Sequence, residues 1–307
     1  MKIINAIKML VSTPWTFIDT IVELYGSWIP DNIYLKIRYR ARLGKSLNLK
    51  NPKTFNEKLQ WLKLYNRKSE YTLMVDKYSV KHYVASKIGK EYIIPTLGVW
   101  DTPDQIEWNK LPNQFVLKTT HGGGGGGVII CKDKSTFDVK LAIVSLRKSL
   151  DSDIYRSFRE WPYKDVKKRI IAEKYMSDYD TADNESEQLK DYKFFCFNGK
   201  VRCFKVDFDR FIDHKANYYN RDSKLLPFGE LCCPPDFNLV LERPMNLEKM
   251  IEIVEILSHN QPFLRVDLYN IKGKIYFGEL TFFPAAGMGK FIPEEWDNTL
   301  GDWISLK

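Results

Sequence analysis

The chain has 307 residues, of which 44% are hydrophobic, 14% aromatic and 28% charged. This composition is typical of a folded globular protein with a sizeable core, and it excludes a disordered chain. The net charge of +8 suits an anionic partner such as a nucleotide, an acidic glycan or an anionic lipid. The basic residues are spread along the sequence, so we expect no nucleic-acid partner.

Cysteine and histidine usage indicates a reducing compartment. The five cysteines form no C-x-x-C pair, and the adjacent Cys232 and Cys233 fit neither a disulfide framework nor a zinc site. The four histidines are too scattered along the sequence to build a metal site. An odd number of cysteines without a framework predicts a cytoplasmic protein.

The N-terminal stretch mixes apolar side chains with charges such as Lys2 and Lys8, and Pro14 interrupts it. A membrane-spanning helix needs about 20 mainly apolar residues, so we expect no span here, and no signal peptide either. Two interpretations stay open. The stretch is either an amphipathic helix at the inner face of a membrane, with Trp15 and Phe17 at the boundary, or a helix packed on the body of the protein, which we favour.

Residues 1–94 are predicted to be mainly helical and to serve as an acceptor-binding or membrane-peripheral region. Thr54 and Glu57 form a capping box, and apolar residues at helical spacing then continue to about Tyr65. A second helix is predicted over about residues 76–88.

The rest of the chain is predicted to form two α+β subdomains, a small lid over residues 95–176 and a second subdomain over residues 177–307. The predicted lid strands are 97–100, 115–118, 128–131 and 170–173, and the lid helix is 137–150. The second subdomain is predicted to be an antiparallel sheet backed by a helix. Its predicted strands are 192–197, 201–206, 263–268 and 275–280, and its helix is 247–259 with Asn246 as N-cap.

Six consecutive glycines lie between two lid strands: Gly122, Gly123, Gly124, Gly125, Gly126 and Gly127. Because glycine has no Cβ and visits positive φ freely, such a loop lets backbone N–H groups approach phosphates. Lys118, at the end of the preceding strand, and His121 add polar side chains. A Walker loop is excluded because no Lys-Ser or Lys-Thr follows, and a Rossmann turn would open a helix. The pattern predicts a hairpin lid over nucleotide phosphates that is poorly ordered without nucleotide.

The last predicted hairpin carries two carboxylates in apolar strands. Asp267 and Glu279 lie in runs that are otherwise apolar enough to be buried, and Arg265 precedes the first. A buried carboxylate is costly unless it is paired or bound to metal. Two of them on neighbouring strands predict a divalent-metal site that holds nucleotide phosphates.

The order of these elements resembles the ATP-grasp superfamily. The residues that carry the resemblance are Lys77, Lys118 with its glycine loop, Glu173-Lys174-Tyr175-Met176, Arg265-x-Asp267 and Glu279-x-Thr281. Residues 51–58, Asn-Pro-Lys-Thr-Phe-Asn-Glu-Lys, are similar to the TupA-like branch, whose members occur among genes for bacterial surface polysaccharides and teichuronopeptide. The resemblance covers nearly all the chain from about Ile29, and it implies an ATP-grasp fold in which two α+β subdomains clasp ATP.

The resemblance also implies a role for each matching residue. Lys77, Lys118 and Lys193 would face the ATP phosphates, and Arg265 would stabilise an acyl phosphate. Glu173 would accept a hydrogen bond from the adenine amino group, Lys174 belongs to the same segment, and the backbone of Tyr175 and Met176 would contact the adenine edge. Asp178 or Asp180 would hold the ribose. Asp267 and Glu279 would bind Mg²⁺; Thr281 stands where many members have asparagine, so the number of metal ions stays open.

The implied reaction is ATP-dependent amide formation between a carboxylate and an amine. The resemblance implies a carboxylate on an acidic glycan or an amino-acid-bearing substrate, in surface-polysaccharide or teichuronopeptide biosynthesis. A sugar-nucleotide glycosyltransferase is the alternative, because Asp207-Phe208-Asp209 matches the D-x-D pattern of such enzymes. A nucleotide-binding scaffold without turnover is the third hypothesis, and the Thr281 departure is the feature that favours it.

Overall fold

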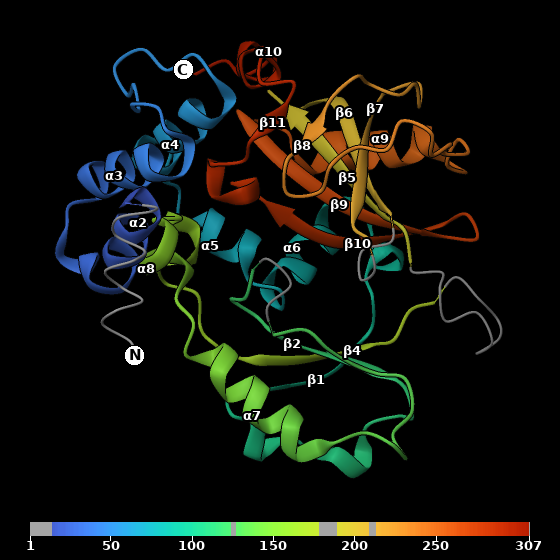
Figure 1. Ribbon diagram of the computed structural model, residues 1–307. Coiled ribbons are helices and arrows are strands. Elements are labelled where there is room, and N and C mark those ends of the chain that lie inside the picture. Colours follow the sequence, from blue (N-terminus) through green and yellow to red (C-terminus); the bar gives the residue numbers. More distant parts are fainter. Residues whose placement is uncertain (1–13, 124–126, 178–188, 209–212, 307) are drawn as a thin grey trace.

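A computed structural model describes residues 14–123, 127–177, 189–208 and 213–306 of the protein. Two main antiparallel sheets, a small two-stranded sheet and a group of N-terminal helices form the described part of the chain (Figure 1). The fold is α+β. The larger sheet has five strands in the order β10 (Lys274–Thr281), β9 (Phe263–Ile271), β5 (Asp191–Phe197), β6 (Lys200–Phe208) and β7 (Lys215–Asn220). The smaller sheet has the order β1 (Thr96–Trp100), β4 (Ile170–Lys174), β2 (Phe115–Thr119) and β3 (Ile129–Cys131). A two-stranded sheet pairs β11 (Phe291–Ile292) with β8 (Gly229–Glu230).

Helices before, between and after the strands complete the fold. The α-helices are α2 (Pro14–Tyr25), α3 (Asp31–Leu43), α4 (Phe55–Tyr65), α5 (Glu70–Val75), α6 (Ser79–Ile88), α7 (Val139–Leu150), α8 (Ile154–Phe158), α9 (Leu247–Leu257) and α10 (Trp296–Asp302). The 3₁₀ turns are η1 (Gly26–Trp28), η2 (Lys90–Tyr92), η3 (Pro103–Gln105), η4 (Trp108–Lys110), η5 (Trp161–Tyr163) and η6 (Pro284–Gly287). None of the helices described is long and apolar enough to cross a membrane.

The five-stranded sheet has two different faces because side chains alternate along each strand. Cys196 of β5 lies against the carbonyl oxygen of Val254 in α9, so one face is apolar and covered by that helix. On the other face, Phe197 of β5 packs against Phe55 of α4, while Lys193 further along the same strand belongs to a charged cluster. The second face is therefore apolar at one end, under the N-terminal helices, and charged at the other.

The N-terminal helices share the main core with this sheet. The capping box starts α4 at Phe55: Thr54 Oγ1 accepts from the Glu57 backbone N–H, and the Glu57 carboxylate accepts from the Thr54 N–H. Apolar residues of α4, α5 and α6 then join the strands in one hydrophobic cluster, among them Phe55, Leu59, Leu62, Met74 and Val84. The region predicted as a separate helical part thus covers one face of the C-terminal sheet.

The four-stranded sheet has a core of its own. Leu146 of α7 packs with Phe115 and Leu117 of β2 and Ile170 of β4 in a second hydrophobic cluster. Figure 1 shows α7 on the outer side of this sheet, with the other side turned toward the five-stranded sheet. These elements lie within residues 95–176, the region predicted to be a lid, and this sheet is called the lid sheet below.

Several local predictions were wrong. The predicted start of α6 near Asp76 falls three residues too early, because the Asp76 carboxylate accepts from the Tyr78 N–H and the Ser79 hydroxyl before the helix begins. Asn246 lies at the start of α9 but does not cap it through its side chain; it takes φ 61° and donates its amide to the Gly273 carbonyl oxygen. The short strands β7, β8 and β11 were not predicted.

Candidate functional site

Lys118 and Glu173 form an ion pair on the lid sheet. Lys118 lies on β2 and Glu173 on β4, and Lys118 Nζ is 2.6 Å from Glu173 Oε2. Lys81 of α6 approaches the other carboxylate oxygen, with Nζ 2.5 Å from Oε1. Burial would raise the pKa of Glu173, but the two lysine charges outweigh it and hold that pKa at about 2. Glu173 is therefore an anion that fixes two lysines, and both of its oxygens are engaged.

Lys77 connects the N-terminal helices to the glycine loop. It lies in the turn between α5 and α6, not on a helix as predicted. Its backbone N–H donates to the Thr120 carbonyl oxygen at 2.9 Å, and its Nζ donates to the Gly122 carbonyl oxygen. Burial lowers the pKa of Lys77, and the charge of Glu279 acts in the opposite sense. The ammonium group thus lies near both the glycine loop and the carboxylates of the five-stranded sheet.

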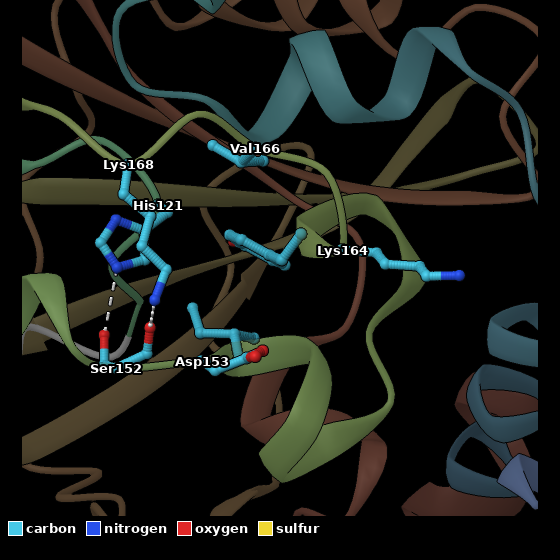
Figure 2. Close-up of a pocket in the computed structure, with 8 residues that line it drawn as sticks. His121, Ser152, Asp153, Lys164, Val166 and Lys168 are labelled. Carbon is cyan, nitrogen blue, oxygen red and sulfur yellow. Dashed lines mark hydrogen bonds between the residues drawn. The ribbon is translucent and has the colours of Figure 1, made fainter. Parts of the chain in front are cut away.

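His121 lines a pocket beside the glycine loop (Figure 2). Its Nε2 lies 3.3 Å from Ser152 Oγ, and Lys168 Nζ donates to the Ser152 carbonyl oxygen at 2.8 Å. Figure 2 shows Lys164 pointing away from His121. Burial, together with the charges of Lys168 and Lys77, lowers the pKa of His121. These surroundings therefore disfavour the protonated form of His121.

The described glycines of the loop are Gly122, Gly123 and Gly127. Gly127 has φ 81°, a backbone conformation that favours glycine. Gly124, Gly125 and Gly126, with the prediction about the order of this loop, lie outside the described residues.

Asp267 and Glu279 face each other across β9 and β10. They are Cα partners, and the register shifts between Phe277 and Glu279. The Asp267 side chain is 4% exposed, whereas that of Glu279 is 39% exposed. Thr281 Oγ1 donates to Glu279 Oε1 at 3.0 Å. The two predicted carboxylates and the threonine hydroxyl therefore form one cluster of oxygen ligands, a donor set that suits Mg²⁺.

Arg265 bridges the two carboxylates. Its Nε and Nη2 donate to Asp267 Oδ1 and Oδ2, each at 2.7 Å, and Nη2 also donates to Glu279 Oε1 at 2.8 Å. Burial raises the pKa of Asp267, and the Arg265 charge opposes that shift. For Glu279, burial would raise the pKa, but the charges of Lys77 and Arg265 hold it at about 2. Glu279 is thus the partly exposed member of the pair, and Asp267 is the member that Arg265 bonds through both oxygens.

Lys193 continues this cluster across the sheet. Cα partners form one transverse row from β10 to β7: Glu279, Asp267, Lys193, Lys205 and Tyr218. Lys193 Nζ is 2.6 Å from Asp191 Oδ2 and also contacts Asp207. The predicted catalytic lysine therefore lies next to Asp267 in the row, and two other acids, Asp191 and Asp207, hold its ammonium group.

The far end of the row is a second charged cluster. Lys205 Nζ lies 3.1 Å from Glu230 Oε2 and 3.7 Å from Cys233 Sγ. Glu230, Cys232 and Cys233 are close enough together to share a metal ion, as are Asp207, His214 and Cys233. However, the Lys205 ammonium already supplies a positive charge to both groups, because it also lies 3.9 Å from Asp207 Oδ1.

Three further predicted residues lie at the end of β4 and directly after it. Lys174 ends β4, with its backbone N–H bonded to the Pro95 carbonyl oxygen at 3.0 Å, and Tyr175 and Met176 follow it. Asp178 and Asp180 lie outside the described residues, as does Asp209 of the D-x-D pattern.

Sequence reasoning missed Lys81 and Asp191 as neighbours of the site. Lys81 was detectable as the residue four positions after Lys77 in a predicted helix. Asp191 was detectable as the residue two positions before Lys193, which places both side chains on one face of a strand.

Comparisons with known proteins identify the family. The family model for TupA-like ATP-grasp proteins matches residues 57–305. No curated protein matches the chain significantly. Among solved structures, the chain is similar to D-alanine–D-alanine ligase from Bacillus anthracis, with 18% identity and a TM-score of 0.39, over 70% of this chain and 58% of that one.

Two further solved structures show the same level of similarity. D-alanine–D-alanine ligase from Helicobacter pylori matches with 15% identity and a TM-score of 0.41, over 81% of this chain and 69% of that one. A RimK-domain ATP-grasp protein from Sphaerobacter thermophilus matches with 8% identity and a TM-score of 0.42, over 78% and 70%. The chain spans less than two thirds of the length of the first ligase. The assignment rests on the family model, and by that match the chain belongs to the TupA-like ATP-grasp family.

Proposed function

We propose that the protein is an ATP-dependent carboxylate–amine ligase. The observation that carries this proposal is the presence of two features: Lys77 bonds the root of the glycine loop through the Gly122 carbonyl, and Asp267, Glu279 and Thr281 cluster around Arg265 on the five-stranded sheet. A triphosphate with a divalent cation requires such an arrangement, with cations and backbone donors on one side and metal-binding carboxylates on the other.

The proposed reaction has two steps. A carboxylate oxygen of the acceptor attacks the γ-phosphorus of ATP, the bond from that phosphorus to the β–γ bridging oxygen breaks, and ADP leaves. An amine then attacks the acyl carbon; phosphate leaves with the electrons of the C–O bond, and the nitrogen loses a proton to give the amide. Neither step needs a covalent protein nucleophile, so the protein's task is to position the reactants and neutralise charge.

Lys77 and Lys118 are proposed to bind the phosphates from the lid side. Both already lie at the base of the glycine loop, Lys77 through the Gly122 carbonyl and Lys118 on the strand that leads into the loop. Glu173 holds Lys118 and Lys81 in place. Contact of Glu173 with adenine remains part of the proposal, and it would require one of these ion pairs to open.

Asp267, Glu279 and Thr281 are proposed to hold Mg²⁺. When bound there, the ion would neutralise charge on the phosphate oxygens. Arg265, which lies between the two carboxylates, is proposed to stabilise the charge of the acyl phosphate and of the tetrahedral oxyanion that follows. Lys193, next in the row, is proposed to face the transferred phosphoryl group.

The acceptor is proposed to be an acidic glycan or an amino-acid-bearing carboxylate in the biosynthesis of surface polysaccharide, capsule or teichuronopeptide in the cytoplasm. The net charge of +8 and the TupA-like family support an acidic substrate of this kind. The glycosyltransferase alternative has less support, because the Asp207 carboxylate is buried and already bonded to Lys193 and His214.

The test is ADP release from ATP and Mg²⁺ with a panel of uronic-acid and amino-acid carboxylates combined with amines. We expect at least one pair to give ADP and amide with the wild-type chain, and Asp267→Asn to abolish both. Asp104→Asn, an exposed lid residue, serves as the matched control. ATP binding without turnover for any pair would favour a scaffold, and release of UDP from a nucleotide sugar would favour a glycosyltransferase.

A further inference from the structure

The first two described helices, α2 and α3, and the turn η1 between them carry large apolar side chains that are exposed to solvent. Trp28 is 81% exposed and Tyr25 is 68% exposed. The exposed large apolar side chains of this region, called here the α2–η1–α3 face, are Trp15, Ile21, Leu24, Tyr25, Trp28 and Ile33. Isolated exposed apolar residues are normal on a protein surface, but six within a helix, a turn and the start of the next helix are a concentration that indicates binding.

Acidic side chains near this face are all neutralised by arginines. Arg38, which is buried, bonds Asp19 at 2.6 Å and Glu23 at 2.7 Å. Asp31 is paired with Arg67 at 2.7 Å and with Arg159 at 3.1 Å. No uncompensated acid is therefore left on α2 or at the start of α3.

Basic side chains on α3 remain exposed beside the apolar residues. Ile33, Lys36 and Arg40 recur at helical spacing and are all exposed. The Arg40 guanidinium lies over the Trp15 ring, 5.7 Å from its centroid, which joins the two helices at the surface. The face thus combines aromatic side chains with positive charge.

The sequence that leads into α2 has the same character. Residues 1–13 contain Lys2 and Lys8 but no acidic residue, and most of the others are apolar. Over residues 1–43, six Lys or Arg residues stand against three Asp or Glu residues, all three of them paired. A protein partner could cover these apolar side chains, but tryptophan and tyrosine mixed with an excess of lysine and arginine, with each acid paired to an arginine, is the composition of segments that lie in a membrane interface.

We propose that the α2–η1–α3 face binds the surface of an anionic lipid membrane, without crossing it. The aromatic and aliphatic side chains would enter the headgroup boundary, and Lys36 and Arg40 would contact lipid phosphates. This inference does not rest on the proposed ligase reaction, because none of its residues belongs to the candidate site. Under this proposal, both interpretations of the N-terminal stretch apply to α2. One side of the helix packs on the protein, through Val22 and the Asp19 ion pair, while another side meets lipid.

The experiment is flotation of the full chain with vesicles of phosphatidylcholine alone or mixed with phosphatidylglycerol. We expect the chain to float with the mixed vesicles, to remain behind with phosphatidylcholine alone, and to dissociate as salt is raised. The double variant Tyr25→Ser/Trp28→Ser should lower the apparent lipid affinity by about tenfold or more, because each side chain would lose apolar burial. Lys36→Glu/Arg40→Glu should abolish the preference for phosphatidylglycerol.

Matched control variants separate this face from general surface properties. Phe237→Ser/Val240→Ser removes two exposed apolar side chains elsewhere, and Lys132→Glu/Lys148→Glu reverses two exposed charges on the lid. Neither should change flotation, and thermal unfolding should show that all variants are folded. Absence of wild-type flotation, or equal losses in target and control variants, overturns the proposal. Concentration-dependent self-association in light scattering that only Tyr25→Ser/Trp28→Ser removes, without lipid binding, would assign the face to a second copy of the chain.

Discussion

Lys77 and Gly122 are joined by a hydrogen bond in which the lysine Nζ donates to the glycine carbonyl oxygen. The backbone N–H of Lys77 reinforces the contact by donating to Thr120, so the turn between α5 and α6 is attached to the root of the glycine loop at two points. In the same turn, Asp76 forms an ion pair with Arg169 at 2.6 Å. This ion pair further fixes the turn that carries Lys77. The N-terminal helices therefore contribute a residue to the candidate phosphate site.

Replacing Lys77 with alanine should weaken ATP binding. A charge-assisted hydrogen bond contributes about 1.5–3 kcal/mol, so we expect the Kd for a non-hydrolysable ATP analogue to rise by about tenfold or more. Isothermal titration calorimetry measures this directly. Lys87→Ala, an exposed position on α6, is the control and should bind as the wild type does. Equal affinities of wild type and Lys77→Ala would remove Lys77 from the phosphate site.

Replacing either carboxylate of the β9–β10 pair should alter the Mg²⁺ requirement. We expect Glu279→Gln to raise the Mg²⁺ concentration for half-maximal ADP release and to lower kcat/KM by about a hundredfold, because the neutral amide is a poor ligand for this cation. Asp267→Asn should abolish ADP release and should also lower stability, because it removes the carboxylate that Arg265 bonds at two points.

The control for this pair is Glu248→Gln, which neutralises an exposed glutamate paired with Arg243. It should leave both the Mg²⁺ dependence and the rate unchanged. An unchanged Mg²⁺ titration in Glu279→Gln would show that the β9–β10 pair is not the metal site.

The sequence predicted the parts of the site that are local in the chain. The capping box of Thr54 and Glu57 places a helix start correctly because both partners lie within one turn. The strand, glycine loop and strand order was likewise visible from β-branched residues on both sides of the glycines, and the structure places β2 and β3 there as antiparallel partners.

The parts that the sequence did not predict depend on distant residues. Lys81 was not expected at the site because its partner, Glu173, lies far from it in the sequence. Strand β7 was not predicted because its run includes Asn217, a polar residue that is buried only because its amide bonds the Asp236 carbonyl oxygen at 2.6 Å. In both cases tertiary partners satisfy a polar group that sequence alone places at the surface.

Acid should destabilise the protein in part through Glu173. Its pKa falls from an ordinary value of 4.5 to about 2 in the fold, so the folded state binds the proton less readily than the unfolded chain. The stabilisation is present above about pH 4.5 and is lost as the pH falls toward 2, a loss on the order of 3 kcal/mol. Urea unfolding measured between these values should show a smaller pH dependence in Glu173→Gln than in the wild type.

A matched comparison for this pH effect is Glu252→Gln, an exposed glutamate on α9 that pairs with Lys249 at 2.9 Å. Its pH dependence should follow that of the wild type, because an exposed ion pair contributes little. If Glu173→Gln and wild type lose stability in parallel, the ion pairs with Lys118 and Lys81 do not account for acid unfolding.

Gly278 should be required for activity because it lets β10 approach β9 at the carboxylate pair. It lies in the bulge between Phe277 and Glu279, and a Cβ at this position would meet the Asp267 carbonyl oxygen at 3.0 Å. Since the obstacle is backbone, Gly278→Ala must move the strands apart, at a cost of about 1–3 kcal/mol, and shift Glu279 away from Asp267.

Gly44→Ala provides the comparison for Gly278→Ala. It forces an alanine into φ 72° with nothing nearby, a comparable strain at a position directly after α3. We expect both variants to unfold at lower temperature, but only Gly278→Ala to lose ADP release, by about tenfold or more. Equal rates in the two folded variants would mean that the spacing of the carboxylate pair is not what the bulge secures.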